Sequence, residues 1–247
     1  MNRKTPLKVG IAGVRGVVGA SFTPQLAMSF AQAFGTYAGR GVIVVGRDTR
    51  PSGLMIQQAV VAGLQSVGCT VTLAGVVPTP TVLLLTRALG AHGGIAITAS
   101  HNGAEWNALK FVGRDGMFLR GEHAAELFDI YHQQEFSLVD ESSIPRVQVI
   151  EQPMREHRAR IEAYLESDLI RSRRFTVAVD GCNGVGALYS QPFLEDLGCR
   201  VVPLHDDPSG LFQRPPEPVP EHLGALGQTV VEQTCDVGFA QDPDGDR

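Results

Sequence analysis

Long hydrophobic runs are absent from this sequence. No apolar stretch approaches the length of about 18 residues that a membrane-spanning helix requires. The segment before Arg15 contains basic residues but no apolar core of the kind that marks a secretory signal peptide. We therefore expect neither a membrane span nor a signal peptide, and we expect no membrane partner.

Cysteine is scarce: the 247 residues contain 4, and no two of them form a C-x-x-C pair. Cys69, Cys182, Cys199 and Cys235 are too far apart in the sequence to suggest a disulfide framework or a cysteine-rich zinc site. The pattern is typical of reduced, mostly buried thiols. It predicts a cytoplasmic protein.

Positive charge is not in excess either. The formal net charge is -5 and the sequence pI is about 5.8. The chain thus lacks the broad basic field that attracts nucleic acids and anionic membranes. We expect no nucleic-acid partner, and an anionic substrate would have to be bound by local groups. The composition does not identify the oligomeric state of the protein.

The sequence does contain enough apolar material for hydrophobic cores. Hydrophobic residues make up 43% of the chain and charged residues 19%, as is typical of a globular protein rather than a disordered one. At 247 residues the chain exceeds one typical domain, so we expect two.

The first half alternates strand-like apolar runs with segments of helical period, a pattern typical of a mainly parallel sheet covered by helices. Thr23 before Pro24 is a typical helix N-cap. Residues 108–119 alternate around a Gly-Arg-Asp-Gly turn and predict a β-hairpin. The expected strands are residues 7–12, 41–46, 69–75 and 93–98, and the expected helices are residues 24–38, 52–67, 80–89 and 122–134.

The second half repeats this plan after residues 137–152, which have no helical period and which we interpret as a linker. The sequence therefore predicts an α/β fold of two consecutive three-layer α/β/α domains with mainly parallel, mixed sheets, at residues 1–148 and 149–247. The expected elements of the second domain are a strand at 174–180, a helix closed by Gly198, a proline-rich loop at 206–222, a helix at 228–235 and a strand at 236–242.

Three aspartates at alternate positions, Asp242, Asp244 and Asp246, follow an apolar strand in the segment Asp-Pro-Asp-Gly-Asp-Arg. Alternate side chains of an extended segment share a face, so the carboxylates can converge. Their repulsion, roughly several kcal/mol per pair at an intermediate dielectric, is removed by a hard cation with oxygen ligands. The pattern predicts a Mg²⁺ site rather than an EF-hand, whose glycine belongs elsewhere in the loop. The alternative is an acidic, solvated loop.

Ser100 and His101 follow an apolar strand in the segment Thr-Ala-Ser-His-Asn. Ligands gather at the carboxyl ends of strands in a parallel α/β sheet, so the location favours function. A Ser–His hydrolase dyad is disfavoured, because adjacent residues of an extended chain point to opposite sides and no G-x-S-x-G motif surrounds Ser100. His101 is therefore expected to be a poor direct base. The alternative is an ST-turn with an exposed histidine.

Arginines near glycines suggest anion binding. Arg15 lies in residues 13–19, which we interpret as a glycine-lined turn where backbone amides and a guanidinium can bind phosphate. Arg47 and Arg50 precede a helix whose N-terminus favours anions, although pairing with the aspartate between them is the favoured interpretation. Residues 181–186 depart from the G-x-G-x-x-G pattern of dinucleotide-binding loops and predict a tight turn.

Together these motifs resemble those of one family, the α-D-phosphohexomutases, which include phosphoglucomutase/phosphomannomutase and phosphoglucosamine mutase. The matching segments occur in the family's order across the whole chain. They are IAGVRGVVG, VGRDTRPSG, VPTPTV, TASHNG-x4-ALKF and DPDGDR.

The resemblance implies a phosphoserine enzyme that uses Mg²⁺. Ser100 would carry the phosphoryl group, and the metal would be bound by that phosphate together with Asp242, Asp244 and Asp246. The implied reaction interconverts hexose 1-phosphate and 6-phosphate in two steps. The phosphoserine gives its phosphoryl group to the hexose monophosphate, and the resulting bisphosphate reorients and returns its other phosphate to Ser100. Such a transfer depends mainly on charge neutralisation and in-line positioning.

The resemblance also implies roles for the cations. Arg15 and Lys110 would act at the reacting phosphate, as charge stabilisers and candidate general acid or base groups, and would contact the phosphosugar substrate. Arg247 would bind the phosphosugar as well. His101 is retained as a candidate catalytic residue beside the serine.

Two positions depart from the family's pattern: Gly103 stands where the family usually has proline, and Ala108 where a glycine is common. The family has four domains, and the resemblance covers the first two. The loops that carry sugar specificity and the final phosphate-binding site have no counterpart in these 247 residues. The resemblance thus identifies no particular sugar, and it implies that the first two domains alone would be inactive.

Two other functions stay open. A strand followed by D-x-D-G also describes the nucleophile loop of haloacid-dehalogenase-like, Mg-dependent phosphatases, in which Asp242 would carry the phosphoryl group. The third interpretation is a catalytically silent module that binds sugar phosphates. The position of a phosphoryl group, on Ser100 or on Asp242, distinguishes the two enzymes.

Overall fold

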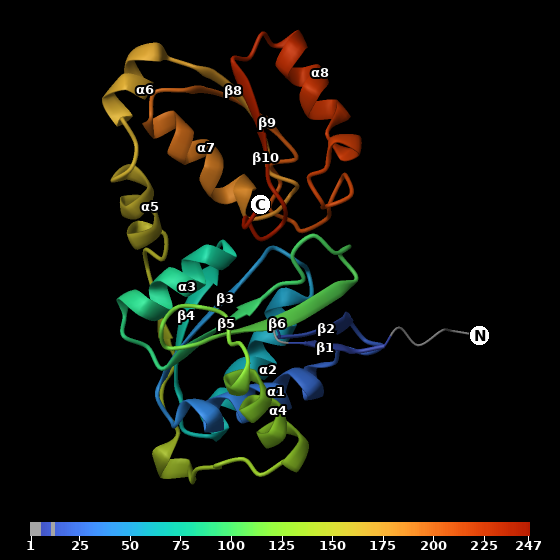
Figure 1. Ribbon diagram of the computed structural model, residues 1–247, viewed down its shortest axis with the longest axis vertical. Helices are drawn as coiled ribbons and strands as arrows, with labels where there is room; N and C mark the ends of the chain where they lie inside the picture. Colours follow the sequence, from blue (N-terminus) through green and yellow to red (C-terminus); the bar gives the residue numbers. More distant parts are fainter. Residues whose placement is uncertain (1–5, 11–12) are drawn as a thin grey trace, which may run out of the picture. The chain divides into compact units, whose positions relative to one another are not determined.

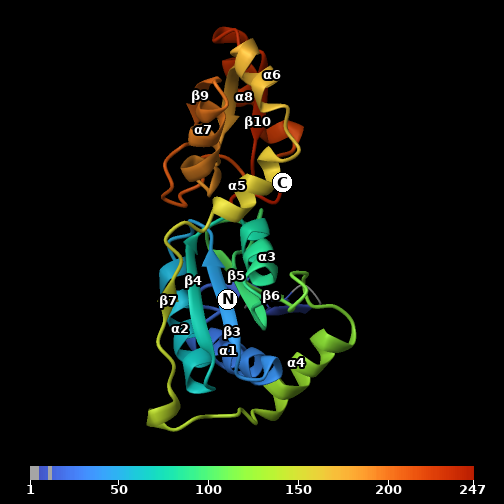
Figure 2. The same cartoon turned by 90° about the vertical axis from the view of Figure 1, so that its left-hand side faces the viewer.

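The computed structural model describes residues 6–10 and 13–247 (Figures 1 and 2). It divides into two compact units. The first unit comprises residues up to Arg47 together with residues 52–99 and 105–156, and the second comprises residues 48–51, 100–104 and 157–247. The two short segments 48–51 and 100–104 therefore group with the second unit, although they interrupt the chain of the first.

The first unit is built on a 7-stranded sheet in the order β1-β2-β6-β5-β3-β4-β7. The strands β5, β3, β4 and β7 pair in parallel, whereas β6 is antiparallel to both of its neighbours, β5 and β2. The strands are β1 (Lys8–Gly10), β2 (Gly13–Val17), β3 (Val42–Arg47), β4 (Thr70–Val76), β5 (Gly93–Ile97), β6 (Trp106–Val112) and β7 (Gln148–Val149).

Helices cover both faces of this sheet. The helices α1 (Pro24–Ala38), α2 (Gly53–Ser66) and α4 (Glu122–Gln133) pack on one face, and α3 (Thr79–Ala88) packs on the other. Helix α1 has the predicted bounds, because Thr23 caps it by accepting a hydrogen bond from the Leu26 N–H at 3.2 Å. Phe30 of α1 stacks on Tyr131 of α4 with ring centroids 3.7 Å apart, within the larger of the two hydrophobic clusters that flank this sheet.

The second unit is a smaller layered fold. Its 3-stranded sheet is entirely parallel, in the order β10-β8-β9. Helices α7 (Gly186–Asp196) and α8 (Gly224–Glu232) lie on opposite sides of it, as Figure 1 shows. The strands are β8 (Thr176–Asp180), β9 (Arg200–Leu204) and β10 (Val237–Ala240), and two further helices, α5 (Arg155–Glu162) and α6 (Ser167–Arg173), precede them.

The predicted α/β class with mainly parallel, mixed sheets is confirmed, but several local predictions need correction. The hairpin expected at residues 108–119 is reduced to a single bridge between Val112 and Phe118, because both edges of β6 are already paired with β2 and β5. The segment 137–152, interpreted as a linker, contains a 3-10 turn (Glu141–Ser143) and the edge strand β7. Residues 11 and 12 of the first expected strand lie outside the described residues.

The four cysteines are free thiols, and three of them are buried. Burial raises the pKa of Cys69 and of Cys182 to about 11, so both thiols stay protonated at neutral pH. Within the described residues, no helix combines the length and the apolar character needed to cross a membrane.

Candidate functional site

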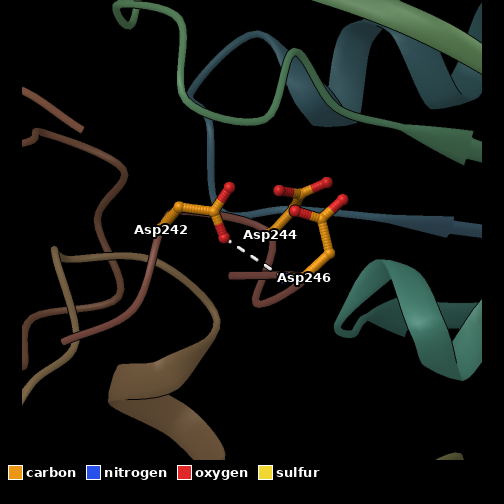
Figure 3. Close-up of side chains that lie close together, drawn as sticks. All are labelled: Asp242, Asp244 and Asp246. Atoms are coloured by element: carbon orange, nitrogen blue, oxygen red, sulfur yellow. Dashed lines mark hydrogen bonds between the residues drawn. The ribbon is translucent and has the colours of Figure 1, made fainter. Parts of the chain in front are cut away.

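Three carboxylates converge directly after strand β10. One ligand oxygen from each of Asp242, Asp244 and Asp246 lies within 4.8 Å of the others, and Figure 3 shows the three side chains turned towards one another. Asp242 and Asp244 are fully buried, and Asp246 is exposed. The second unit thus holds a compact set of oxygen donors at the carboxyl end of one of its parallel strands.

The convergence has a different cause from the predicted one. Strand alternation predicts an extended segment, but residues 243–245 form a turn, with Gly245 at a φ of 65°. Asp242 closes this turn: its Oδ1 accepts hydrogen bonds from the N–H groups of Asp246 at 3.2 Å and Arg247 at 3.3 Å. The chain therefore wraps around the first carboxylate, and this curvature gathers the aspartates.

The three carboxylates repel one another, and this repulsion acts on the ionisation of Asp242. Burial raises the pKa of Asp242 to about 7, with further increases from Asp244 and Asp246, while the hydrogen bond from Ser100 lowers it. The charges of Asp244 and Asp246 therefore oppose the ionisation of Asp242. A hard divalent cation such as Mg²⁺, which prefers carboxylate oxygens, fits this donor set and removes the repulsion.

Ser100 lies against the turn that carries the three aspartates, residues 242–247, which we call the aspartate turn. Its Oγ donates a hydrogen bond of 2.9 Å to Asp242 Oδ2, although 142 positions separate the two residues. The side chain is in a loop after β5, and Ser100 is only 9% exposed. The backbone of Ser100 has a φ of 50°, a left-handed conformation that is uncommon for a residue with a Cβ atom.

The left-handed conformation of Ser100 also corrects the prediction for His101. An extended chain would point the two side chains apart. Instead, the Ser100 Oγ and the His101 Nδ1 are 3.3 Å apart. A turn at Ser100 places both side chains on one side of the loop, so His101 lies within reach of the hydroxyl.

Arg15 and Lys110 belong to the first unit and lie on one face of its sheet. The prediction that Arg15 lies in a turn is wrong. Arg15 lies in the middle of β2, where it pairs with Ala108 of β6. Gly13 begins this strand because β2 approaches β6 so closely that a Cβ atom there would overlap the carbonyl oxygen of Leu109. Directly paired residues share a face, and so does the next but one residue along β6, so Lys110 is a diagonal neighbour of Arg15.

Arg247 lies in an exposed ion pair. Its guanidinium donates to Glu217 Oε1 at 2.9 Å, and both side chains are more than 40% exposed (43% and 45%). Exposed pairs of this kind contribute roughly 0–1 kcal/mol, so the guanidinium can exchange Glu217 for another anion at low cost.

Two buried arginines outside the predicted site hold its loops. Arg50 forms the expected ion pair with Asp48, at 2.9 Å, and also donates to backbone carbonyls of the serine loop, residues 100–104. Arg214 pairs with Asp180 at 2.7 Å and donates to the carbonyl of Gln241, next to the first aspartate, at 2.7 Å. The motif around Arg50 was a usable signal, whereas Arg214 in its proline-rich loop carried none.

The predicted tight turn at residues 181–186 is present and packs against the aspartate turn. Cys182 and Asn183 both have left-handed backbones, with φ values of 53° and 51°. A Cβ atom on Gly184 would lie 2.6 Å from Pro243 Cα, so only glycine allows the two turns to pack at this distance.

Comparison with known proteins identifies both halves of the chain. The family model described as phosphoglucomutase/phosphomannomutase, alpha/beta/alpha domain I, matches residues 6–138, and the model for domain II of the same family matches residues 155–247.

Individual relatives carry related names. The chain is 37% identical over 244 residues to a phosphoglucomutase/phosphomannomutase of Thermococcus kodakarensis, with 96% of this chain and 53% of that protein covered. It is 34% identical over 241 residues to a phosphoglucosamine/phosphogalactosamine mutase of Sulfurisphaera tokodaii, with coverage of 96% and 53%. The chain thus spans about half the length of the curated relatives it matches.

A solved structure shows the same fold. The crystal structure of a phosphoglucomutase/phosphomannomutase family protein from Burkholderia thailandensis matches with a TM-score of 0.79 and 26% sequence identity, covering 96% of this chain and 52% of that one.

Proposed function

The chain belongs to the phosphoglucomutase/phosphomannomutase family, and from this premise we propose that it carries the phosphoserine and metal centre of a phosphohexomutase. Ser100 is the residue that accepts and donates the phosphoryl group. The reaction interconverts the 1-phosphate and the 6-phosphate of a hexose through a bisphosphorylated sugar.

One observation carries this proposal. The hydroxyl of Ser100 lies 2.9 Å from Asp242, the residue around which the other two aspartates gather. A phosphoryl group on Ser100 would add further negative oxygens beside three carboxylates, and a bound cation would offset the resulting repulsion. This contact supports a single centre that contains both Ser100 and the aspartate turn.

The residues that would hold the metal are Asp242, Asp244 and Asp246, with the phosphate on Ser100. When bound, Mg²⁺ neutralises negative charge on the phosphoryl oxygens and on the carboxylates. Side chains of the protein accept the proton that leaves the Ser100 hydroxyl. As Ser100 accepts a phosphoryl group its Oγ proton must leave, and two acceptors lie near it, Asp242 Oδ2 at 2.9 Å and His101 Nδ1 at 3.3 Å.

Cations of the chain would bind the phosphosugar. Arg15 and Lys110 form a diagonal pair on one sheet face, with Arg15 exposed and Lys110 half-buried. Both are suited to stabilising charge at the reacting phosphate, and Lys110 is also a candidate acid or base. Arg247 contributes a third cation to the phosphosugar after leaving Glu217.

The competing enzyme is a haloacid-dehalogenase-like phosphatase with Asp242 as nucleophile. Family membership favours the mutase, and so does the geometry at Asp242. Its Oδ1 accepts two backbone N–H groups, and its Oδ2 accepts the serine hydroxyl. A carboxylate whose oxygens are both engaged in this way is suited to holding a turn and a cation rather than to attacking phosphorus.

The proposal is tested by locating the phosphoryl group. The chain is incubated with a hexose 1,6-bisphosphate and Mg²⁺, and phosphorylation is mapped by peptide mass spectrometry. We expect phosphate on Ser100, none in Ser100→Ala, and an unchanged amount in Ser137→Ala, which alters an exposed serine of the first unit.

Two results would contradict the proposal. Phosphate on Asp242 would support the phosphatase instead. Binding of the sugar phosphate without phosphorylation of any residue would support the silent binding module.

A further inference from the structure

The loop that carries Ser100 is attached to one buried guanidinium. Arg50 is 1% exposed, and its terminal nitrogens donate hydrogen bonds to the backbone carbonyls of Ser100 at 2.6 Å, Asn102 at 2.7 Å and Gly103. Three carbonyls within four residues therefore converge on a single positive charge.

Arg50 is itself held rigidly. Its Nε donates to Asp48 Oδ2 at 2.9 Å, and its backbone N–H donates to Asp48 Oδ1 at 3.0 Å. The ring of Phe212 lies against the guanidinium, with 5.0 Å between the ring centroid and Cζ. The neighbouring Thr49 donates its hydroxyl proton to the carbonyl of Asn183 at 2.9 Å. The guanidinium thus has little freedom to move, and its hydrogen bonds restrict the motion of the loop as well.

The direction of the carbonyls decides the direction of the amides. The described peptide bonds are trans, and in a trans peptide the C=O and the following N–H point in opposite directions. Since the carbonyls of Ser100, Asn102 and Gly103 point at Arg50, the N–H groups of His101, Gly103 and Ala104 point away from it. Backbone N–H groups turned to one side are the donors that bind phosphate oxygens in anion-binding loops.

We propose that Arg50 is the positioning residue of the phosphoserine loop. By binding three carbonyls it keeps Ser100 in its left-handed conformation, directs the hydroxyl towards Asp242, and turns the loop's amides towards a phosphoryl group on Ser100. It also withdraws carbonyl oxygens that would otherwise repel the phosphate. This inference rests on the proposed function, because it assumes that Ser100 is the phosphorylated residue.

A purely structural role for Arg50 makes a different prediction. An arginine that only neutralises the buried Asp48 becomes dispensable once Asp48 loses its charge, since a buried ion pair can often be replaced by neutral groups at little cost in stability. A positioning residue is still needed in that background, because removing the charge of Asp48 does not replace the hydrogen bonds to the three carbonyls.

The experiment compares Arg50→Met, the double variant Asp48→Asn/Arg50→Met, and Arg50→Lys. The single change to methionine leaves a buried carboxylate without its guanidinium, and the double variant removes that charge. Arg171→Met is the control, because Arg171 pairs with Asp168 on the surface of the same unit, with its side chain 48% exposed. The rate of phosphoryl transfer from a hexose 1,6-bisphosphate to Ser100 is measured against the bisphosphate concentration.

We expect the double variant to melt closer to the wild type than Arg50→Met does. The maximal transfer rate of the double variant should nevertheless be lower than that of the wild type by on the order of a hundredfold, because the reacting group is misplaced. The half-saturating concentration of the bisphosphate should change little. Arg50→Lys should have a higher rate than Arg50→Met, because an ammonium keeps the positive charge. Its rate should stay below that of the wild type, because an ammonium cannot bind three carbonyls in one plane. A wild-type rate in the double variant would show that Arg50 is only structural.

Hydrogen exchange in the unphosphorylated protein separates this inference from the proposed function. We expect the amides of residues 100–104 to exchange at least about tenfold faster in the double variant and at an unchanged rate in Arg171→Met. If the wild type takes no phosphate on Ser100, the proposed function fails, and the exchange still decides whether Arg50 orders the loop. Unchanged exchange in the double variant would overturn the positioning role.

Discussion

Ser100 Oγ and Asp242 Oδ2 are joined by a hydrogen bond of 2.9 Å that spans 142 positions of the sequence. This contact sets a hydroxyl group against a carboxylate that is buried, has a raised pKa, and lies next to two further aspartates. We therefore expect the magnesium affinity and the stability of the protein to depend on the ionisation of Asp242 and on the charges beside it.

Magnesium affinity should depend on pH. A cation binds the ionised form of Asp242, whose pKa is raised to about 7 by burial and by Asp244 and Asp246. Below that pKa a proton must be released for each cation bound, so we expect the association constant to fall by up to about tenfold per pH unit, and to level off above it. Titration calorimetry in buffers of different ionisation enthalpy measures both quantities. Binding that is independent of pH and releases no proton near neutrality would contradict the prediction.

Without metal, the stability of the protein should decline as pH rises. The pKa of Asp242 is higher in the folded state than its ordinary value of 3.8, so the folded protein binds more protons between about pH 4 and about pH 7. The free energy of unfolding should therefore decrease over that interval, by up to roughly 4 kcal/mol from this group. Urea denaturation in a chelator measures it. Asp242→Asn, which cannot ionise, should flatten the profile, and an equally steep decline in that variant would assign the effect to other groups.

A fixed negative charge at position 100 should strengthen the response to magnesium. Ser100→Asp places a fourth carboxylate beside the cluster and, in the absence of metal, should lower the free energy of unfolding by on the order of 2 kcal/mol. Aspartate tolerates the left-handed backbone found there, so the loop itself is not strained further. The rise in melting temperature on adding Mg²⁺ should exceed that of the wild type. Ser137→Asp, an exposed position in the first unit, should behave as the wild type does.

The packing of two turns should control the metal site. Gly184→Ala would put a Cβ atom 2.6 Å from Pro243 Cα, and both groups are buried backbone that cannot move aside. We expect a loss of about 1–3 kcal/mol in unfolding free energy and weaker Mg²⁺ binding. Gly227→Ala is the matched control: it lies within α8 with no atom near the added methyl group, and should stabilise the protein by about 0.5–1 kcal/mol. Equal Mg²⁺ affinity in the two variants would show that the packing at Gly184 does not affect metal binding.

Much of the fold could be predicted because its signals are local. Helix α1 has the predicted bounds, since its cap, its first proline and its apolar period lie within one segment. Strand β2 was missed because its five residues contain two glycines and resemble a turn. Its strand character comes from pairing with β6, about ninety positions further along the chain, and no local pattern reports such a partner.

The candidate site divides in the same way. The spacing of Asp242, Asp244 and Asp246 is enough to predict a hard cation, whereas the phosphoryl-carrying role of Ser100 is implied only by the resemblance to the family. The side-chain direction of His101 was predicted wrongly, because it depends on the left-handed backbone of Ser100. The role of Arg50 was only half visible: its ion pair with Asp48 is local, but its three carbonyl partners lie in another loop.

The sequence by itself determined the chemical groups, their order and the α/β alternation that carries them, because caps, periodicity and motifs act over a few neighbouring residues. Only the tertiary structure decided which of these groups meet. The contacts from Ser100 to Asp242, from Arg50 to the serine loop and from Arg214 to Gln241 join segments distant in the chain. Such contacts form because packed turns and buried charges must satisfy one another in space, a condition that spacing along a sequence does not express.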